Sequence, residues 1–413
     1  MKVEHITRRF VRQFWGGTES SVLGMAQGLT ARGHSTEILT STALDKAPIE
    51  EIDGITVRRF SYFYPYLGLT AEQRLQMDFR AGNLFSFSLL YYLMASEPAD
   101  IYHLHTGKRL GGIVRTAARR HCRPYVVSLH GGVVDVPNDE RERWTAPTRK
   151  SLEWGRVLGA ATGARRVLHD ASAILCVNRE EQRILSEQMP GKRILWTPNT
   201  VNVQRFKNGN GPRFRIKHGL PTSAMIVLNV ARVDEQKNQL DTVEIFDRTA
   251  AQVPDLWLLL AGASTNVEYA DRLSERIAAS PNAARIRCLG NIESSSQDMA
   301  DLYRAADLFL LSSVHEPFGI VLLEAWAAGT PIVASRVGGI PSFVQSGANG
   351  LLYESGDVAE ASRLVVRLLR EPAEAALLRD AAAKSVLQFD AERAIVDLIS
   401  LYEEVRIERS VRA

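Results

Sequence analysis

The sequence of 413 residues predicts an α/β protein with two domains, each built on a doubly wound parallel sheet. The chain is longer than one hydrophobic core usually organises. Short apolar runs alternate with helix-like segments along most of it. A stretch with several Pro and Gly residues, from 198 to 221, separates two series of such runs. Hydrophobic residues make up 45% and charged residues 23%, as in globular proteins with substantial cores.

The first series predicts seven strands within residues 1–198. Helix-like segments such as Ser20–Arg32 and Gly111–His121 lie between them, which favours parallel strands joined by crossover helices. The predicted strands are Val3–Ile6, Ser35–Thr40, Ile55–Phe60, Ile101–Leu104, Tyr125–Leu129, Ala173–Val177 and Ile194–Thr197.

The second series predicts a domain over residues 199–390, with a linker at about 199–222. Beyond Gly356 the pattern is almost wholly helical, and we expect the last helix, residues 391–413, to pack back on the first domain. The predicted strands are Met225–Val230, Leu256–Ala261, Ile286–Leu289, Leu308–Leu311 and Pro331–Ala334.

The net charge of +3 hides an asymmetry between the two halves. Residues 1–198 carry 27 Lys and Arg against 20 Asp and Glu, whereas the remainder carries 23 against 27. The excess is concentrated in residues 101–166, with 13 basic residues against five acidic ones. A positive surface of this kind suits phosphate, nucleic acid or anionic lipid, and a solvated surface is the alternative.

Cysteines and apolar segments point to a cytoplasmic protein. Cys122, Cys176 and Cys288 are far apart and odd in number, so they indicate neither a disulfide framework nor a zinc site. Residues 1–10 contain charges and no apolar run of signal-peptide length. The most apolar segment, Leu84–Ala95, is too short to cross a bilayer and is expected to form a buried or interfacial helix.

A glycine loop follows the first predicted strand. Gly16 and Gly17, in the segment Trp15–Glu19, precede a helix. Glycines allow the backbone to approach a ligand, and a helix start offers N–H groups and a positive dipole end to a phosphate. The segment therefore predicts an anion site, although a tight turn alone would also explain the two glycines.

The strongest motif follows the apolar run Leu308–Leu311. In His315–Ala325 two acids, Glu316 and Glu324, stand eight positions apart around a helix expected to start near Phe318. Glu324 lies among apolar residues, where a carboxylate without a partner would be costly. A helix-capping Glu316 and a solvated Glu324 are the alternative interpretation.

A basic pair follows the run Met225–Val230. Arg232 and Lys237 stand where the charge developing on a leaving diphosphate can be neutralised without a metal, and two ordinary surface cations are the alternative.

Together these segments resemble the retaining glycosyltransferases of the GT-B fold, specifically glycosyltransferase family 4. The resemblance rests on the two glutamates, the Arg232 and Lys237 loop, the glycine pair and Pro198-Asn199, and it covers nearly the whole chain in order. It implies two Rossmann-like domains facing each other across a cleft, a nucleotide bound mainly by the second domain, and chemistry that requires no metal or other cofactor.

The resemblance also implies roles for single residues. Glu316 matches the carboxylate that contacts the donor sugar and the reacting centre, and Glu324 matches the residue that holds the ribose hydroxyls. Phe318, Gly319 and Ile320 match a segment whose backbone contacts the sugar and diphosphate. Arg232 and Lys237 match the diphosphate clamp, and Gly16 and Gly17 match a loop that approaches the diphosphate from the first domain.

Three histidines follow or line first-domain strands. His130 comes directly after the run Tyr125–Leu129 and resembles a histidine beside the donor sugar; a loop histidine packed on the sheet is the alternative. His103 and His105 share one face of a strand by the two-residue period; core packing is expected for them, and an approach of one of them to the acceptor is the alternative. The chain departs from the family pattern at Asn199-Thr200-Val201-Asn202, where members commonly have Asn-Gly-Val-Asp.

The sequence therefore predicts a retaining glycosyltransferase that moves a hexosyl-type group from a UDP- or GDP-sugar to a saccharide, lipid-linked or small-molecule acceptor, in polysaccharide, glycolipid or glycoconjugate synthesis. We expect no nucleic-acid partner, and peripheral association of the basic segment with anionic membrane. A sugar-nucleotide epimerase and a non-catalytic nucleotide-sugar-binding subunit are the alternatives.

Overall fold

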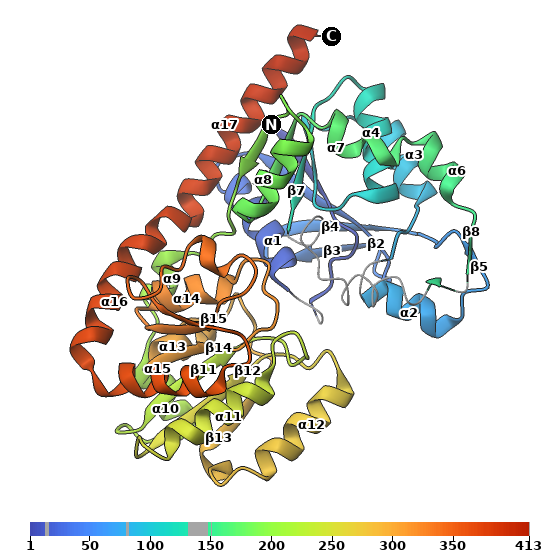
Figure 1. The fold of residues 1–413 in the computed structure, drawn as a ribbon. Helices are drawn as coiled ribbons and strands as arrows, with labels where there is room; N and C mark the ends of the chain where they lie inside the picture. The colour runs from blue at the N-terminus through green and yellow to red at the C-terminus, as the bar shows by residue number, and fades with distance from the viewer. Residues whose placement is uncertain (13–15, 80–81, 131–147, 150, 413) are drawn as a thin grey trace. The chain divides into compact units, whose positions relative to one another are not determined.

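The computed structural model describes residues 1–12, 16–79, 82–130, 148–149 and 151–412. The chain divides into two units, one made of Met1–Pro198 with Ile395–Ala413 and the other of Asn199–Ala394. Each unit holds a mainly parallel sheet between layers of helices (Figure 1). The alternation of apolar runs and helical segments predicted this α/β architecture, and the prediction is confirmed.

The sheet of the first unit has eight strands in the order β10-β9-β7-β6-β1-β2-β4-β3. All neighbours are parallel except β3 and β4, an antiparallel hairpin whose first strand the sequence analysis missed. A separate antiparallel pair joins β5 (Tyr66–Leu67) to β8 (Leu152–Glu153). The sheet strands are β1 (Lys2–Ile6), β2 (Ser35–Ser41), β3 (Ile49–Ile52), β4 (Ile55–Phe60), β6 (Ile101–Leu104), β7 (Tyr125–Leu129), β9 (Ala173–Cys176) and β10 (Ile194–Trp196).

Helices cover both faces of this sheet. On one face α3 and α4 pack over Leu104 and Val127. On the other, Tyr402 of α17 packs with Val3 and Val126. The helices are α1 (Gly17–Thr30), α2 (Ala71–Phe79), α3 (Phe87–Ala95), α4 (Lys108–Arg120), α6 (Arg156–Ala161), α7 (Val167–Asp170), α8 (Arg179–Gln188) and α17 (Ala391–Arg412), which joins this unit from Ile395 onward.

The second unit has six parallel strands in the order β13-β12-β11-β14-β15-β16. Strands such as β14 are buried on both faces, which explains their uninterrupted apolar sequences. The strands are β11 (Met225–Val230), β12 (Leu256–Ala261), β13 (Ile286–Gly290), β14 (Leu308–Leu311), β15 (Ile332–Ser335) and β16 (Leu351–Tyr353). The helices are α9 (Val203–Lys207), α10 (Gly211–Lys217), α11 (Gln239–Ala250), α12 (Val267–Ala278), α13 (Gln297–Ala305), α14 (Ile320–Ala328), α15 (Val358–Arg370) and α16 (Pro372–Ser385).

Three local expectations in this unit were wrong. Strand β16 was missed because it has only three residues. Helix α14 begins at Ile320 rather than near Phe318, since Gly319 adopts a left-handed conformation that delays the first helical turn. Residues 199–222, expected to form a linker, carry α9 and α10, because Asn202 and Asn210 accept N-cap hydrogen bonds from Arg205 and Arg213.

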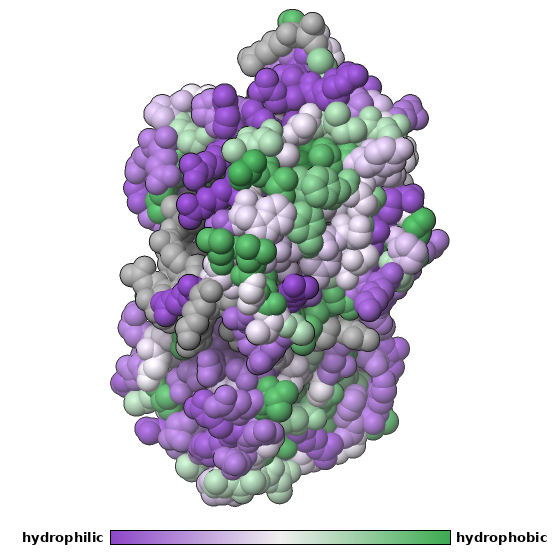
Figure 2. Space-filling model, turned by 90° about the vertical axis from the view of Figure 1, so that its right-hand side faces the viewer, coloured by the Kyte–Doolittle hydropathy of each residue, from purple (hydrophilic) through white to green (hydrophobic). Residues whose placement is uncertain are grey.

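One face of the first unit exposes apolar side chains near the β5–β8 pair. Leu67 and Leu152 lie opposite each other in that pair and are 58% and 68% exposed. Phe63 stacks on both Phe87 and Trp154, and the latter two are exposed. Green residues gather in the upper half of the view in Figure 2. Among the described helices, none is both long and apolar enough to span a bilayer.

Candidate functional site

Each sheet has one place where the strand order reverses. In the second unit β11 lies between β12 and β14, and in the first unit β1 lies between β2 and β6. Loops at the carboxyl ends of such strand pairs run in opposite directions and leave a crevice for ligands. The predicted residues of the second unit follow β11 and β14, which are hydrogen-bonded neighbours in the sheet.

Hydrogen bonds join the loops after β11 and β14. The Gln236 side chain donates to the carbonyl oxygen of His315 at 3.0 Å, and Val314 N–H donates to the carbonyl oxygen of Gln236 at 2.9 Å. The Ser312 hydroxyl donates to the carbonyl oxygen of Lys237 at 3.1 Å. These hydrogen bonds hold the two loops together, so the side chains that the loops carry have fixed positions relative to each other.

This structure brings Lys237 and Glu316 together. The Nζ of Lys237 lies 2.5 Å from Oε2 of Glu316, and their side chains are 13% and 11% exposed. Arg232 is more exposed, and its Nη2 lies 3.3 Å from a carboxylate oxygen of Asp234. Both cations of the predicted clamp are thus paired with carboxylates.

A glycine pair after β15, which the sequence analysis missed, supports the Glu316 loop. Gly339 N–H donates to the carbonyl oxygen of Glu316 at 2.9 Å. A Cβ at Gly338 would lie 2.0 Å from that oxygen, and a Cβ at Gly339 would lie 2.2 Å from the carbonyl oxygen of Pro317. Two adjacent glycines after a strand were the available signal, because only glycine permits such close backbone contact.

The segment after Glu316 starts helix α14. The Phe318 side chain is buried and stacks on Phe343 with ring centroids 4.8 Å apart, so only its backbone is available to a ligand. Gly319 is the N-cap residue with φ of 101°, and Ile320 is the first helical residue. The first N–H groups of a helix have no partner within it, which suits contacts with anionic oxygens.

Glu324 lies in the second turn of α14 and has a buried partner. The Tyr303 hydroxyl donates to Oε2 of Glu324 at 2.6 Å. Burial raises the pKa of Glu324 above its ordinary value, and the Tyr303 hydrogen bond and the nearby Arg205 oppose this rise. The structure thus provides the partner that the apolar surroundings of Glu324 require.

In the first unit, Gly16 and Gly17 open helix α1 after β1. Gly16 is the N-cap residue, and its N–H donates to the carboxylate of Glu19 at 3.1 Å. Arg9 lies 3.6 Å from the other oxygen of the same carboxylate. A carboxylate of the chain therefore already meets the positive end of this helix. Trp15, part of the predicted loop, lies outside the described residues.

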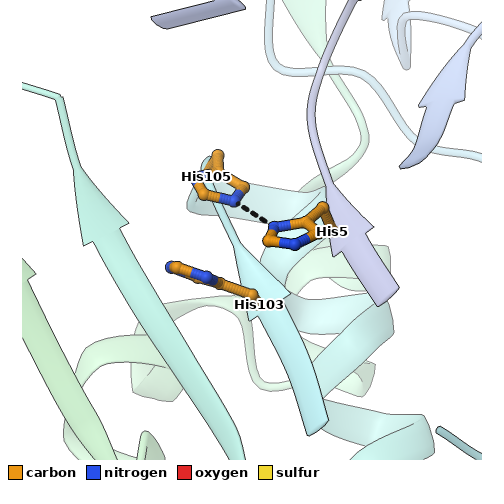
Figure 3. A group of neighbouring side chains, drawn as sticks. All are labelled: His5, His103 and His105. Carbon is orange, nitrogen blue, oxygen red and sulfur yellow. Dashed lines mark hydrogen bonds between the residues drawn. The ribbon is translucent and has the colours of Figure 1, made fainter. Parts of the chain in front are cut away.

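His130 belongs to a cluster of four histidines at the reversal point of the first sheet. Nε2 of His130 lies 2.9 Å from Nδ1 of His105, and Nε2 of His105 lies 3.0 Å from Nδ1 of His5. His103 packs beside them, with its ring centroid 4.1 Å from that of His105. Figure 3 shows the rings of His5, His103 and His105 close together, with His5 on one strand and His103 and His105 on the neighbouring segment.

Burial keeps these imidazoles neutral. It lowers the pKa of His5 to about 3 and that of His130 to about 4. Burial and the neighbouring imidazoles together hold the pKa values of His103 and His105 well below 6.5. Nitrogen atoms of His5, His103 and His105 lie within 4.8 Å of one another, so among the described residues these three form a group that could hold a metal ion.

Comparison with known protein families identifies the family to which both units belong. Residues 16–200 match the model of the glycosyl transferase 4-like domain, and residues 211–385 match that of the glycosyl transferases group 1. A D-inositol 3-phosphate glycosyltransferase of Mycobacterium sp. (strain KMS) is 30% identical over 87% of this chain and 79% of its own. A D-inositol 3-phosphate glycosyltransferase 1 of Catenulispora acidiphila is 28% identical over 94% of this chain and 90% of its own. The chain belongs to glycosyltransferase family 4.

Solved structures share the fold of this glycosyltransferase. Anabaena HepE in complex with UDP and glucose has a TM-score of 0.71 and 17% identity, over 98% of this chain and 100% of that one. Sucrose-phosphate synthase from Thermosynechococcus elongatus has a TM-score of 0.73 and 22% identity, over 98% of both chains. The two Rossmann-like units are those of the GT-B fold, as predicted.

These relationships make the protein an enzyme that transfers a glycosyl group from a nucleotide-sugar donor to an acceptor, and they favour this activity over the epimerase alternative.

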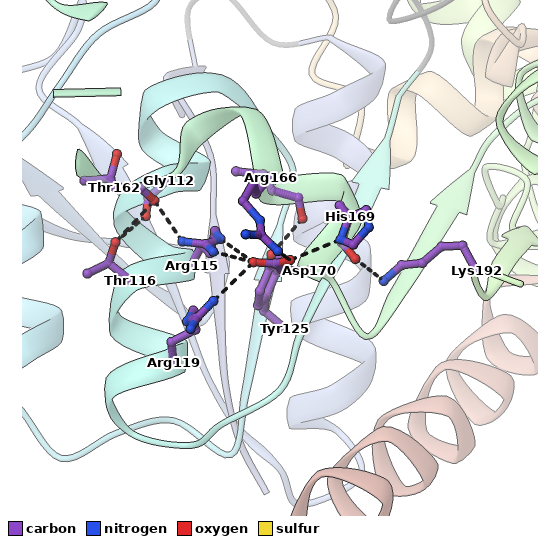
Figure 4. Close-up of polar contacts among 11 residues, drawn as sticks. Gly112, Arg115, Thr116, Arg119, Tyr125, Thr162, Arg166, His169, Asp170 and Lys192 are labelled. Carbon is purple, nitrogen blue, oxygen red and sulfur yellow. Dashed lines mark hydrogen bonds and ion pairs between the residues drawn. The ribbon is translucent and has the colours of Figure 1, made fainter. Parts of the chain in front are cut away.

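Several basic side chains of segment 101–166 in this glycosyltransferase are paired with carboxylates, so less of their positive charge is exposed than the sequence suggested. Arg109 and Arg115 are buried and pair with Glu153 and Asp170. Arg119 and Arg166 also pair with Asp170 and remain 59% and 62% exposed (Figure 4). Two of the predicted surface cations are therefore structural, because their guanidinium groups hold α4 against neighbouring segments.

Near this cluster a cavity of about 370 Å³ is lined by Arg119, Arg123 and Arg409 together with Asp170. Tyr125, the first residue of β7, also lines it. The cavity therefore lies toward the amino ends of the strands, whereas His130 follows the carboxyl end of β7.

Proposed function

We propose that this enzyme transfers a hexosyl group from a UDP-sugar to its acceptor with retention of anomeric configuration. The observation that carries the proposal is the Lys237–Glu316 pair at the carboxyl ends of β11 and β14. A cation for the diphosphate and a carboxylate for the sugar stand side by side there, as cleavage of the bond between sugar and phosphate requires. UDP is chosen over GDP because HepE and the pneumococcal O-GlcNAc transferase GtfA, which share this fold, were solved with UDP or a UDP-sugar.

In this proposal each residue of the second unit meets one part of the donor. Arg232 and Lys237 bind the diphosphate, and the backbone of Phe318, Gly319 and Ile320 contacts the sugar and phosphate oxygens. Glu316 binds the sugar hydroxyls and lies near the anomeric carbon. Glu324 accepts hydrogen bonds from the ribose hydroxyls.

The first unit supplies His130 to the reacting sugar and Gly16 and Gly17 to the diphosphate. The carboxylate of Glu19 meets the same helix end, so the glycine N–H groups bind phosphate only if this carboxylate turns away. The assignment of Gly16 and Gly17 therefore predicts that Glu19→Gln strengthens donor binding.

The chemistry follows from where charge develops. As the glycosidic bond breaks, the anomeric carbon gains oxocarbenium character and negative charge grows on the leaving diphosphate. Preorganised cations stabilise that charge. Glu316, held by Lys237, faces the positive charge of the sugar, and the leaving phosphate accepts the acceptor's proton from the same face.

The test uses the full-length protein with UDP-glucose, UDP-N-acetylglucosamine and GDP-mannose, each combined with an inositol phosphate and with lipid-linked saccharides. NMR of the isolated product reads its anomeric configuration. We expect an α-linked product from a UDP-sugar, unaffected by EDTA. An inverted product, or turnover with the GDP-sugar alone, would contradict the proposal. Formation of a second sugar nucleotide without acceptor would indicate epimerisation.

We propose in addition that the apolar surface formed by Leu67, Phe87, Leu152 and Trp154 contacts the acyl region of an anionic membrane. Arg156, which is 80% exposed and lies 3.5 Å from the Glu153 carboxylate, is close in sequence and supplies charge for anionic headgroups. Sedimentation with anionic vesicles should fall steeply at high salt and should fall for the Leu152→Ser and Trp154→Ser variants. Equal pelleting with neutral vesicles would overturn this proposal.

A further inference from the structure

The cavity at the amino end of β7 has no part in the function proposed above. Segments far apart in the sequence line it: the end of α4 with the loop that follows, the end of α7, the residue before β9, and the last turns of α17. All of them belong to the first unit. Because β7 is a strand of five residues, its two ends are separated by about 13 Å, and His130 follows the other end.

The lining of this cavity carries an excess of positive charge. Arg119, Arg123 and Arg409 line it together with one acid, Asp170, so three positive charges less one negative charge leave a formal charge of +2. The side chains of Arg119 and Arg123 are 59% and 38% exposed, and Arg409 is half-buried. A ligand in the cavity can therefore reach them.

The carboxylates near Arg119 and Arg123 are held by closer donors. Asp170 accepts a hydrogen bond from Nε of Arg115 at 2.7 Å, whereas Arg119 lies 3.5 Å away from it (Figure 4). Asp100 accepts a hydrogen bond from a backbone N–H at 2.9 Å, whereas Arg123 lies 3.6 Å away from it. Distances of 3.5 Å and more are too long for a good hydrogen bond. Most N–H groups of Arg119 and Arg123 are therefore available to a ligand.

Arg409 has no anionic partner among the residues that the structure describes. The neighbouring Glu408 pairs with Arg193 at 2.9 Å instead. Nε of Arg409 is buried and has no acceptor, so this guanidinium group has lost contact with water without gaining a hydrogen bond in return. Because Nε is buried, we assign contact with a ligand to the Nη groups at the end of the side chain.

The chemistry of the lining favours a phosphate monoester. Guanidinium groups bind phosphate oxygens through paired N–H···O bonds. A phosphate monoester carries a charge of about −1.5 to −2 at neutral pH, which matches the charge of the lining. The volume of about 370 Å³ falls in the range of small-molecule sites, so the cavity has room for more than the phosphate group. Ala118, Pro124 and Tyr125 supply apolar surface for the remainder of the ligand.

We propose that this cavity binds a phosphate monoester through Arg119, Arg123 and Arg409. A soluble sugar phosphate and a lipid headgroup present the same chemical group, and the experiment below distinguishes these two sources. The bound phosphate neutralises arginines from α4, from the loop after it and from α17. It therefore stabilises the docking of the last turns of α17 on the first unit.

The first arm of the test is calorimetry of the full-length protein with glucose 6-phosphate, in the presence of excess UDP and with glucose as the uncharged probe. If the source is soluble, glucose 6-phosphate binds and glucose does not. Its affinity then falls about tenfold in Arg123→Gln and in Arg409→Gln. Arg183→Gln is the matched control, because Arg183 is 56% exposed on α8 of the same unit and pairs with Glu180 and Glu187.

The second arm is sedimentation with vesicles that contain either phosphatidate, a monoester, or phosphatidylglycerol, a diester. If the source is a lipid, the protein prefers phosphatidate, and Arg123→Gln and Arg409→Gln abolish this preference. Trp154→Ser, which tests the apolar surface proposed above, should lower pelleting with both lipids and keep the preference. The proposal is overturned if neither monoester binds, or if binding is the same in wild type and in both arginine variants.

Stability without ligand separates binding from a structural role of the arginines. In phosphate-free buffer we expect the urea midpoints of Arg123→Gln and Arg409→Gln to match that of wild type, since neither arginine has a close carboxylate. The monoester that binds should raise the midpoint of wild type alone. An equal rise in the variants would overturn the proposal. Arg119→Gln replaces Arg409→Gln if that variant does not fold.

Discussion

The ammonium group of Lys237 lies 2.5 Å from the carboxylate of Glu316, although the two residues follow different strands and are 79 positions apart in the sequence. Their side chains are largely buried, so either charged group without its partner would raise the free energy of the folded protein. The residue assigned to the diphosphate and the residue assigned to the sugar are therefore one electrostatic unit. Substitution of either one changes the environment of both.

We first predict that Arg232→Ala and Lys237→Ala lower turnover more than they weaken binding of the donor. Charge on the diphosphate grows during bond cleavage, so a preorganised cation gains interaction energy in the transition state, typically worth about 10²-fold or more in kcat. Steady-state kinetics with varied donor measure this. An increase confined to the donor KM would contradict the role. Arg248→Ala is the control, since Arg248 pairs with Glu244 on the surface of α11.

The second prediction concerns Glu316→Gln. We expect kcat to fall by about 100-fold, because in the proposed function the carboxylate faces the developing positive charge of the sugar. Binding of UDP, which lacks the sugar, should not weaken. It should strengthen slightly, since Lys237 loses its anionic partner and is free for the diphosphate. Calorimetry with UDP checks this, and a weaker UDP affinity would show that the two residues are wrongly assigned.

Much of the fold was predictable because the strands of a doubly wound sheet are buried on both faces. Runs such as Leu308–Leu311 are therefore continuous in sequence and bounded by polar loops. Because polar loops bound these runs, the residues that directly follow each strand could also be recognised from the sequence. The Asn202 and Asn210 caps were not recognised, because asparagine in a stretch with several glycines also indicates loop.

The contacts within the site were not predictable from single positions. The partner of Glu324 is Tyr303, which looks like an ordinary core residue of α13 in the sequence. The contact of His5 with His105 depends on the register of β1 against β6, which no local pattern fixes. Gly338 was missed because its requirement comes from the backbone of Glu316, 22 positions earlier.

The third prediction is that Gly338→Ala displaces the Glu316 loop. Gly338 has φ of 52°, and a Cβ would meet the carbonyl oxygen of Glu316 at 2.0 Å, so the loop has to move. Gly347 has a similar positive φ of 84° but open space around its Cβ position. Both variants carry the conformational cost of about 1 kcal/mol. Only Gly338→Ala should also lower kcat, by about tenfold or more. Equal loss of kcat in both variants would contradict the role of Gly338.

The fourth prediction concerns the pH dependence of stability. The folded-state pKa values of His5 and His130, about 3 and 4, lie below the ordinary value of 6.5. Below pH 6.5 the unfolded chain therefore binds protons that the folded chain does not. The stabilisation is fully present above pH 6.5 and is lost as pH falls toward the folded-state values. Each such histidine contributes about 1.4 kcal/mol per pH unit within that window.

Urea unfolding of wild type and His5→Phe between pH 7 and pH 5 measures this slope. The variant should be less stable than wild type at pH 7 but should lose less stability on acidification. Parallel pH profiles for the two proteins would show that His5 is not held neutral in the folded state.

The last prediction is that Glu324 binds the ribose and that the hydrogen bond from Tyr303 limits the rise of the Glu324 pKa. If the carboxylate of Glu324 accepts hydrogen bonds from both ribose hydroxyls, then Glu324→Gln should weaken UDP binding about tenfold or more. Wild type should also discriminate against 2′,3′-dideoxy-UDP, and the variant should not.

Burial raises the pKa of Glu324, and the Tyr303 hydroxyl opposes that rise. Tyr303→Phe should therefore raise the pKa further, so that UDP affinity is lost at a higher pH than in wild type as the solution is acidified. Calorimetry with both nucleotides at pH 7.5 and 5.5 measures these effects. If Glu324→Gln kept the preference of wild type for UDP over its dideoxy analogue, the ribose would be bound elsewhere, and the Tyr303–Glu324 pair would serve the packing of α13 against α14 alone.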